Sequence, residues 1–278
     1  MKTRIISGAV AIVLLIGVLI LHSTIFFDIA FSLIGCLMVY ELFKAFKLEK
    51  NIGLMIISLA FTAASGMYMN YRNYIELIGA YALVVFVYIV IAAAILLKDH
   101  EKIELGSHFA VCGYTVLIAF AVFAISVIEF SDREFGLENV ILTFCGAWLA
   151  DTGAYFAGTL FGRHKLCPGI SPKKTVEGLI GGIVSNALFL VLAGFIISRI
   201  REGVTVNYTV LVFAGVFCAI LGLIGDLLAS LVKRSCGIKD FGKIMPGHGG
   251  TLDRFDSVVF VAPFMMMLLN GAFPVFSL

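Results

Sequence analysis

The chain has 278 residues, of which 61% are hydrophobic and 14% charged, and its formal net charge is +2. A soluble domain carries about 45 to 50% apolar and about 25% charged residues, so this composition excludes a soluble protein and predicts an integral membrane protein. The small net charge gives no reason to expect a nucleic-acid partner. Unbroken apolar runs such as 5–21 and 80–97 are typical of membrane-spanning helices and differ from the alternating pattern of a β-barrel.

We therefore predict an all-α, polytopic integral membrane protein with about nine transmembrane helices. The first apolar run follows Lys2 and Arg4 and resembles a signal peptide, but no cleavage pattern follows it, so we expect a retained first span. Each crossing needs about 20 apolar residues. The candidate spans are 5–21, 25–43, 52–70, 75–97, 109–130, 137–160, 176–198, 207–232 and 257–276.

The basic residues predict the orientation of these spans. With a cytoplasmic N-terminus, the outer loops hold only Arg72, Arg133, Arg199 and Arg201 of the 20 lysines and arginines. Lysine and arginine are concentrated in cytoplasmic loops of membrane proteins, so we expect this orientation. It places the long polar stretch 230–256 on the cytoplasmic side.

Two carboxylates stand inside predicted spans, Asp151 in the sixth and Asp226 in the eighth. A carboxylate within a membrane costs about 2.5 to 3.5 kcal/mol on insertion scales, so the default interpretation is a functional group facing the interior of the helix bundle. The alternative for Asp151 is an acid satisfied by nearby hydroxyl groups, with Gly153 and Gly158 beside it indicating close helix packing.

Asp226 begins a polar stripe on one helix face. Ser230, Lys233 and Arg234 follow it at spacings of four, seven and eight residues, so these side chains lead from the span toward the cytoplasm. The alternative is an internal pair between Asp226 and a basic residue of the same helix, whose long side chain reaches the membrane surface.

Ser171 and Pro172 predict the start of the seventh helix, with Lys173 and Lys174 in its first turn. Cations there oppose the helix dipole, and a bound anion would explain them. Solvated lysines at a membrane interface are the alternative.

The polar stretch 230–256 reads SLVKRSCGIKDFGKIMPGHGGTLDRFD. Its Gly249-Gly250 pair allows a backbone to approach a ligand closely, and His248 is either a turn-stabilising donor or a phosphate ligand. Asp253 and Asp256 are three residues apart at the start of the predicted ninth helix, so we expect them to share a helix face. They either cap the ninth helix or, with Asp226, bind a hard cation such as magnesium.

Cysteines are scattered without closely spaced pairs. Cys167 and Cys236 lie in polar loops near His164 and His248, but structural zinc normally uses closely spaced ligand pairs, so we do not predict a zinc site.

These residues resemble the phosphatidate cytidylyltransferases, the CDP-diacylglycerol synthases. The resemblance lies in the polar stretch, in Asp151 to Tyr155 and in Ser171 to Gly178, and so covers the C-terminal half. Met245 and Thr251 depart from the family pattern. We expect one membrane domain over 1–278, with N-terminal spans (1–108) of no assigned role and a catalytic half (137–278) that carries the polar stretch.

The resemblance implies transfer of a cytidylyl group from CTP to phosphatidic acid. It implies Mg²⁺, with a second monovalent or divalent cation as an option, and a multi-pass homodimer in the inner membrane with its active-site loops in the cytoplasm. The implied metal ligands are Asp226, Asp253 and Asp256. The other candidate catalytic residues are Lys233, Arg234 and His248. The candidate substrate-binding residues are Lys173, Lys174, Ser230, Lys239, Asp240, Arg254 and Asp151.

Two other functions stay open from the sequence. A CTP-dependent polyprenol kinase also joins a cytidine nucleotide to a membrane lipid. A cation- or proton-coupled transporter would also place carboxylates within spans, although a permeation path does not require a cluster of lysines and arginines on one side.

Overall fold

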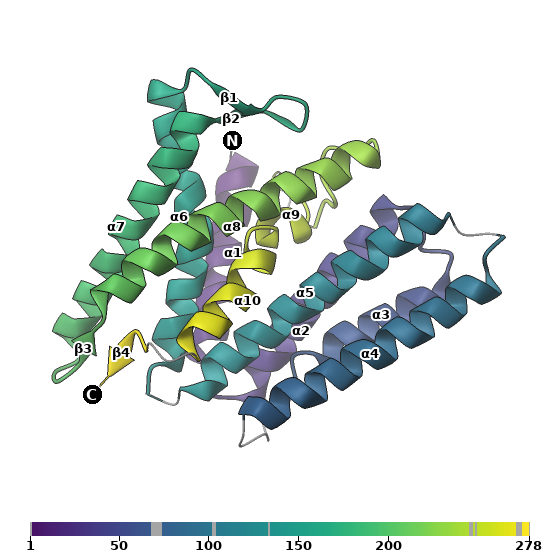
Figure 1. Cartoon of the computed structure of the whole chain (residues 1–278), viewed down its shortest axis with the longest axis horizontal. Coiled ribbons are helices and arrows are strands. Elements are labelled where there is room, and N and C mark those ends of the chain that lie inside the picture. Colours follow the sequence, from purple (N-terminus) through teal and green to yellow (C-terminus); the bar gives the residue numbers. More distant parts are fainter. Residues whose placement is uncertain are drawn as a thin grey trace. The chain divides into compact units, whose positions relative to one another are not determined.

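The computed structural model describes residues 2–67, 74–101, 104–132, 134–244, 247, 249–270 and 274–277. These residues are mainly helical (Figure 1), and six of the described helices are long and apolar enough to cross a membrane. The predicted all-α polytopic membrane protein is therefore confirmed. The apolar segments Ser7–Ile20 (part of the helix Lys2–Ile20), Ile52–Ala64 and Val258–Leu269 are shorter, so the expected nine crossings stay a prediction.

The chain forms two compact units. Unit 1 contains residues 1–130 and 235–255, and unit 2 contains residues 131–234 and 256–278. Most of the polar stretch thus belongs with the N-terminal helices, whereas its first residues and Asp256 belong to unit 2.

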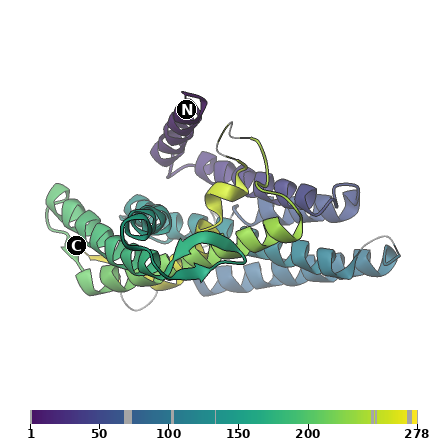
Figure 2. The same ribbon diagram turned by 90° about the horizontal axis from the view of Figure 1, so that it is seen from above.

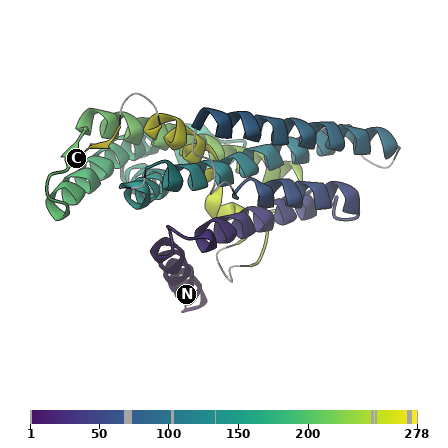
Figure 3. The same ribbon diagram turned by 90° about the horizontal axis from the view of Figure 1, so that it is seen from below.

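Unit 1 consists of helices and of residues 235–255 of the polar stretch (the polar segment). Its elements are α1 (Lys2–Ile20), α2 (Ile25–Ala45), α3 (Ile52–Ala64), α4 (Tyr74–Lys98), α5 (Leu105–Ser131) and the short α9 (Leu252–Phe255). Figures 2 and 3 show α1 projecting away from the other helices of this unit. Helix α2 approaches α5 closely at Gly35, where a Cβ atom would lie 2.6 Å from the Val122 side chain.

Unit 2 combines helices with two small antiparallel sheets. Its elements are α6 (Gly136–Phe161), β1 (Lys165–Cys167), β2 (Ser171–Thr175), α7 (Val176–Ile200), β3 (Thr205–Val206), α8 (Tyr208–Ser235), α10 (Val258–Leu269) and β4 (Phe276–Ser277). Strand β1 pairs with β2, with Lys165 opposite Thr175, and β3 pairs with β4, with Val206 opposite Phe276.

Small and polar residues hold the helices of unit 2 together. A Cβ atom at Gly153 would overlap the Ser185 side chain of α7, as expected for close packing of α6 on α7. The fully buried Asn186 amide donates to the carbonyl oxygens of Gly146 at 3.0 Å and Gly215 at 2.9 Å. One side chain of α7 therefore links α6 and α8.

The predicted helix start at Ser171 is wrong. Residues 171–175 form β2, and α7 begins at Val176 with Thr175 as its N-cap, whose hydroxyl oxygen accepts the Gly178 N–H at 3.1 Å. Pairing with β1 gives hydrogen-bond partners to backbone N–H and C=O groups of β2 that a helix would pair within itself. Pro172 is compatible with this strand because proline is tolerated at the edge of a sheet. Lys173 and Lys174 consequently lie on a strand and not in the first turn of α7.

Candidate active site

The strand β2 separates the two lysines. Successive side chains of a strand point to opposite faces, and here Lys173 is exposed whereas Lys174 is half-buried. The Lys174 Nζ atom forms an ion pair with Oδ2 of Asp226 on α8, and the two side chains are 22% and 27% exposed. Asp226 thus pairs with a lysine from another element, whereas the alternative interpretation from the sequence placed its partner on its own helix.

Two further carboxylates of unit 2 interact with Asp226. Asp151 on α6 and Asp256, in the turn before α10, both interact electrostatically with it. Burial, followed by the repulsion from Asp226, raises the pKa of Asp256 to about 7, and the Lys233 charge opposes this shift. The predicted carboxylates Asp151, Asp226 and Asp256 therefore belong to one cluster within unit 2.

Ser257 links two members of this cluster. Its hydroxyl donates to Asp151 Oδ2 at 3.3 Å, and its backbone N–H donates to Asp256 Oδ1 at 2.8 Å. Ser257 was not among the predicted residues, because a serine at the start of an apolar helix is a common capping residue. The approach of α8 to this turn requires Gly225, where a Cβ atom would lie 2.4 Å from the Asp256 carbonyl oxygen.

In unit 1, Asp253 joins two separate parts of the polar segment through hydrogen bonds to their backbone. Its Oδ2 atom accepts the N–H groups of Phe241 at 2.8 Å and Gly250 at 3.0 Å, and the side chain is 9% exposed. These bonds give Asp253 a structural task besides its predicted task as a metal ligand. A substitution of Asp253 alone would therefore not distinguish the two tasks.

Glu41 is the second carboxylate that holds this segment. It lies near the end of α2, is 2% exposed, and accepts the N–H groups of Thr251 at 3.0 Å and Leu252 at 2.9 Å. The Thr251 carbonyl oxygen accepts N–H groups of Arg254 and Phe255, so Thr251 caps α9 with its backbone. Glu41 was not among the predicted residues, although a charge just inside the apolar run 25–43 is the same signal that singled out Asp151 and Asp226.

The remaining predicted residues are distributed over both units. Lys239, Asp240 and Arg254 are exposed in unit 1. In unit 2, the predicted stripe on α8 is helical, with Ser230 and Lys233 half-buried and Arg234 exposed. His248 and Met245 lie outside the described residues. Within the described part of the chain, no group of three or more His, Cys, Asp or Glu side chains is placed to hold a metal ion.

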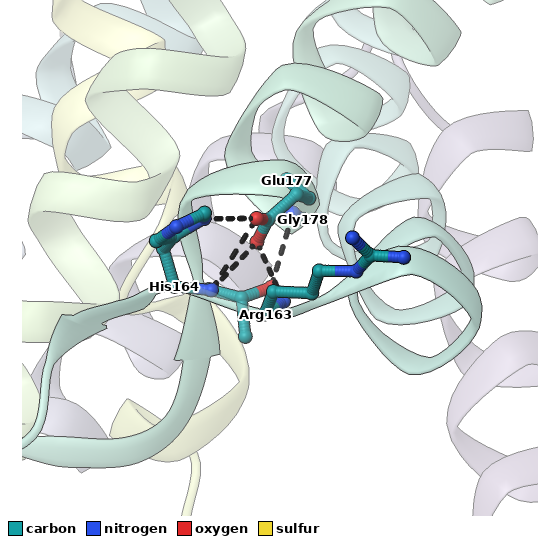
Figure 4. Close-up of polar contacts among 5 residues, drawn as sticks. Arg163, His164, Glu177 and Gly178 are labelled. Carbon is teal, nitrogen blue, oxygen red and sulfur yellow. Dashed lines mark hydrogen bonds and ion pairs between the residues drawn. The ribbon is translucent and has the colours of Figure 1, made fainter.

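Glu177 fixes the base of the β1–β2 hairpin, as Figure 4 shows. Its carboxylate accepts the backbone N–H groups of Arg163 at 3.0 Å and His164 at 3.2 Å, and contacts His164 Nδ1 at 2.6 Å. The first turn of α7 is thereby tied to the segment that follows α6. This arrangement helps to position β2, which carries Lys174.

The model of the cytidylyltransferase family matches residues 2–271. The chain belongs to this family. It is 43% identical over 140 residues to a phosphatidate cytidylyltransferase of Staphylococcus haemolyticus, covering 50% of this chain and 52% of the relative. It is 40% identical over 177 residues to one of Staphylococcus epidermidis (58% and 66% of the two chains) and 36% identical over 184 residues to one of Staphylococcus aureus (60% and 68%). The matches thus span about half to two thirds of these relatives' lengths.

Proposed function

We propose that this protein transfers the cytidylyl group of CTP to phosphatidic acid, releasing pyrophosphate and forming CDP-diacylglycerol. The observation that carries the proposal is the family match over nearly the whole chain, together with relatives named for this activity. The lysine and carboxylate cluster of unit 2 supports it, because such a cluster suits phosphate groups and a cation.

The chemistry needs charge neutralisation more than proton transfer. A phosphate monoester has a second pKa of about 6, so the attacking phosphatidate oxygen is already an anion at neutral pH. The difficulty is the approach of this anion to a polyanionic nucleotide. Lys173, Lys174, Lys233 and Arg234 of unit 2 are proposed to hold phosphate oxygens, and Lys239 and Arg254 are proposed for the same task in unit 1.

Magnesium, when bound, would neutralise charge on the α-phosphate and on the leaving pyrophosphate. Carboxylate oxygens are its preferred protein ligands, and it often uses only one or two of them together with substrate phosphates. The mutually repelling carboxylates of Asp226 and Asp256 fit such a cation, and we propose them as ligands. Asp253 as a further ligand, and a second cation, stay predictions.

Labelled CTP tests the proposal. Purified protein in vesicles containing phosphatidic acid is supplied with magnesium and with CTP labelled at either the α- or the γ-phosphate. We expect the α-label in the lipid product and the γ-label in pyrophosphate. Transfer of the γ-label to lipid would instead indicate a kinase, and cation flux without CTP turnover would indicate a transporter.

The two neighbouring lysines provide an internal comparison. Lys174→Ala leaves Asp226 without its ion-pair partner, so we expect kcat to fall about a hundredfold, in the range for removing one electrostatic group from an active site. Lys173→Ala removes an exposed charge and is expected to raise the KM for CTP or phosphatidate by up to about fivefold. Steady-state kinetics on both variants measure the contrast, and an unchanged KM in Lys173→Ala would favour a solvated lysine.

We further propose an inner-membrane homodimer whose active-site residues face the cytoplasm. The distribution of lysines and arginines along the sequence and the cytoplasmic supply of CTP support the orientation, and the homodimer stays a prediction. The mass of the protein in lipid nanodiscs would measure the subunit number.

A further inference from the structure

We propose that Glu41 is a positioning residue for cytidylyl transfer, acting through the backbone of the segment 235–255. This inference rests on the proposed function, because it assumes that the segment takes part in the reaction. Glu41 itself need not touch a substrate, since both of its carboxylate oxygens accept backbone N–H groups within unit 1.

The Glu41 carboxylate holds the start of α9 in a bidentate geometry. Each oxygen of the buried carboxylate accepts a different N–H group, from Thr251 at 3.0 Å and from Leu252 at 2.9 Å. These are the capping residue and the first residue of α9. Hydrogen bonds to an ionised acceptor are stronger than neutral ones. Two of them on adjacent residues fix both the position and the direction of the α9 start, from which Asp253 and Arg254 project.

The backbone of the segment comes unusually close to the Glu41 carboxylate. A Cβ atom at Gly242 would lie 2.1 Å from Glu41 Oε1, and one at Gly250 would lie 2.5 Å from Oε2. The carboxylate therefore fits between two stretches of the segment that only glycine allows to come so close. Asp253 joins the same two stretches through Phe241 and Gly250. Glu41 supplies the corresponding connection to a transmembrane helix.

A carboxylate and an amide differ as acceptors at this position. A neutral amide offers one acceptor oxygen and one donor group, so Glu41→Gln would direct an NH₂ group at one of the two N–H groups. Glu41→Asp keeps the charge but shortens the side chain by one methylene. We expect Glu41→Gln to lose the attachment of the first residues of α9, and Glu41→Asp to keep part of it.

Hydrogen exchange measures the anchoring without any substrate. In Glu41→Gln we expect amide exchange in peptides covering 239–256 to rise about tenfold or more, the effect of losing a hydrogen bond to a charged group. Peptides of α2 and α5 should stay as protected as in the unaltered protein. Glu49→Gln is the matched control, because Glu49 lies exposed in the turn after the same helix.

Kinetics then measure the consequence for the reaction. We expect kcat to fall at least about tenfold in Glu41→Gln, with an intermediate value in Glu41→Asp and an unchanged value in Glu49→Gln, because small misplacements of reacting groups are costly. If Glu41→Gln does not accumulate in membranes, Glu41→Asp takes its place in both measurements.

Three results would overturn the inference: unchanged exchange in 239–256, increased exchange throughout unit 1, or increased exchange in 239–256 with an unchanged kcat. Failure of the proposed function gives a different result. In that case the unaltered protein transfers no label to phosphatidic acid, while the exchange comparison still reports whether Glu41 anchors the segment.

Discussion

Asp226→Asn is expected to lower the rate of cytidylyl transfer at least about a hundredfold. The substitution removes a carboxylate proposed to hold magnesium, and electrostatic groups of this kind contribute about that much to catalysis. It also leaves the half-buried Lys174 ammonium without its ion-pair partner. Transfer of α-labelled cytidylyl groups at saturating magnesium measures the loss, and full activity of the variant would exclude Asp226 as a metal ligand.

A double variant separates these two effects. Asp226→Asn alone is expected to lower the melting temperature by about 2 to 4 °C, the shift that corresponds to roughly 1 kcal/mol in a protein of this size. Adding Lys174→Ala removes the ammonium group that has lost this partner, so Asp226→Asn with Lys174→Ala should regain much of this stability. We expect it to regain none of the activity. Recovery of activity along with stability would mean that Asp226 serves only to neutralise Lys174.

Gly250→Ala is the second substitution for which we expect a large effect. The added Cβ atom would lie 2.5 Å from the Glu41 carboxylate and 2.6 Å from the backbone nitrogen of Gly242. A backbone atom cannot move aside as the end of a flexible side chain can, so the segment 235–255 must shift. A displacement of about 1 Å in an active-site element can cost about a hundredfold in rate, and we expect a loss of that order in kcat.

Gly106→Ala provides the control for this substitution. It lies in the first turn of α5, where a Cβ atom would meet nothing within 4 Å, and alanine is favoured over glycine in helices. We expect this variant to keep both its activity and its melting temperature. Normal kcat in Gly250→Ala would show that the segment tolerates displacement and would weaken the proposed part of the segment in catalysis.

The sequence allowed the candidate site residues to be chosen, apart from Glu41 and Ser257, but not their partners. Asp151 and Asp226 were recognisable because a charge within an apolar run needs an explanation, and Glu41 carries the same signal. The helix start at Ser171 was predicted wrongly because local capping preferences outweighed the pairing of 171–175 with β1. That pairing depends on two segments meeting in space, and no local pattern reports it.

By itself, the sequence determined the membrane environment, the helical class and the set of charged residues suited to phosphate chemistry. These properties follow from composition and from the 20-residue length of apolar runs, and both are local. Only the tertiary structure decided that Lys174 pairs with Asp226 and that Glu41 holds a backbone segment 210 residues further along the chain. Such contacts join residues distant in sequence, and their geometry is set by helix packing around glycines at which a Cβ atom would not fit.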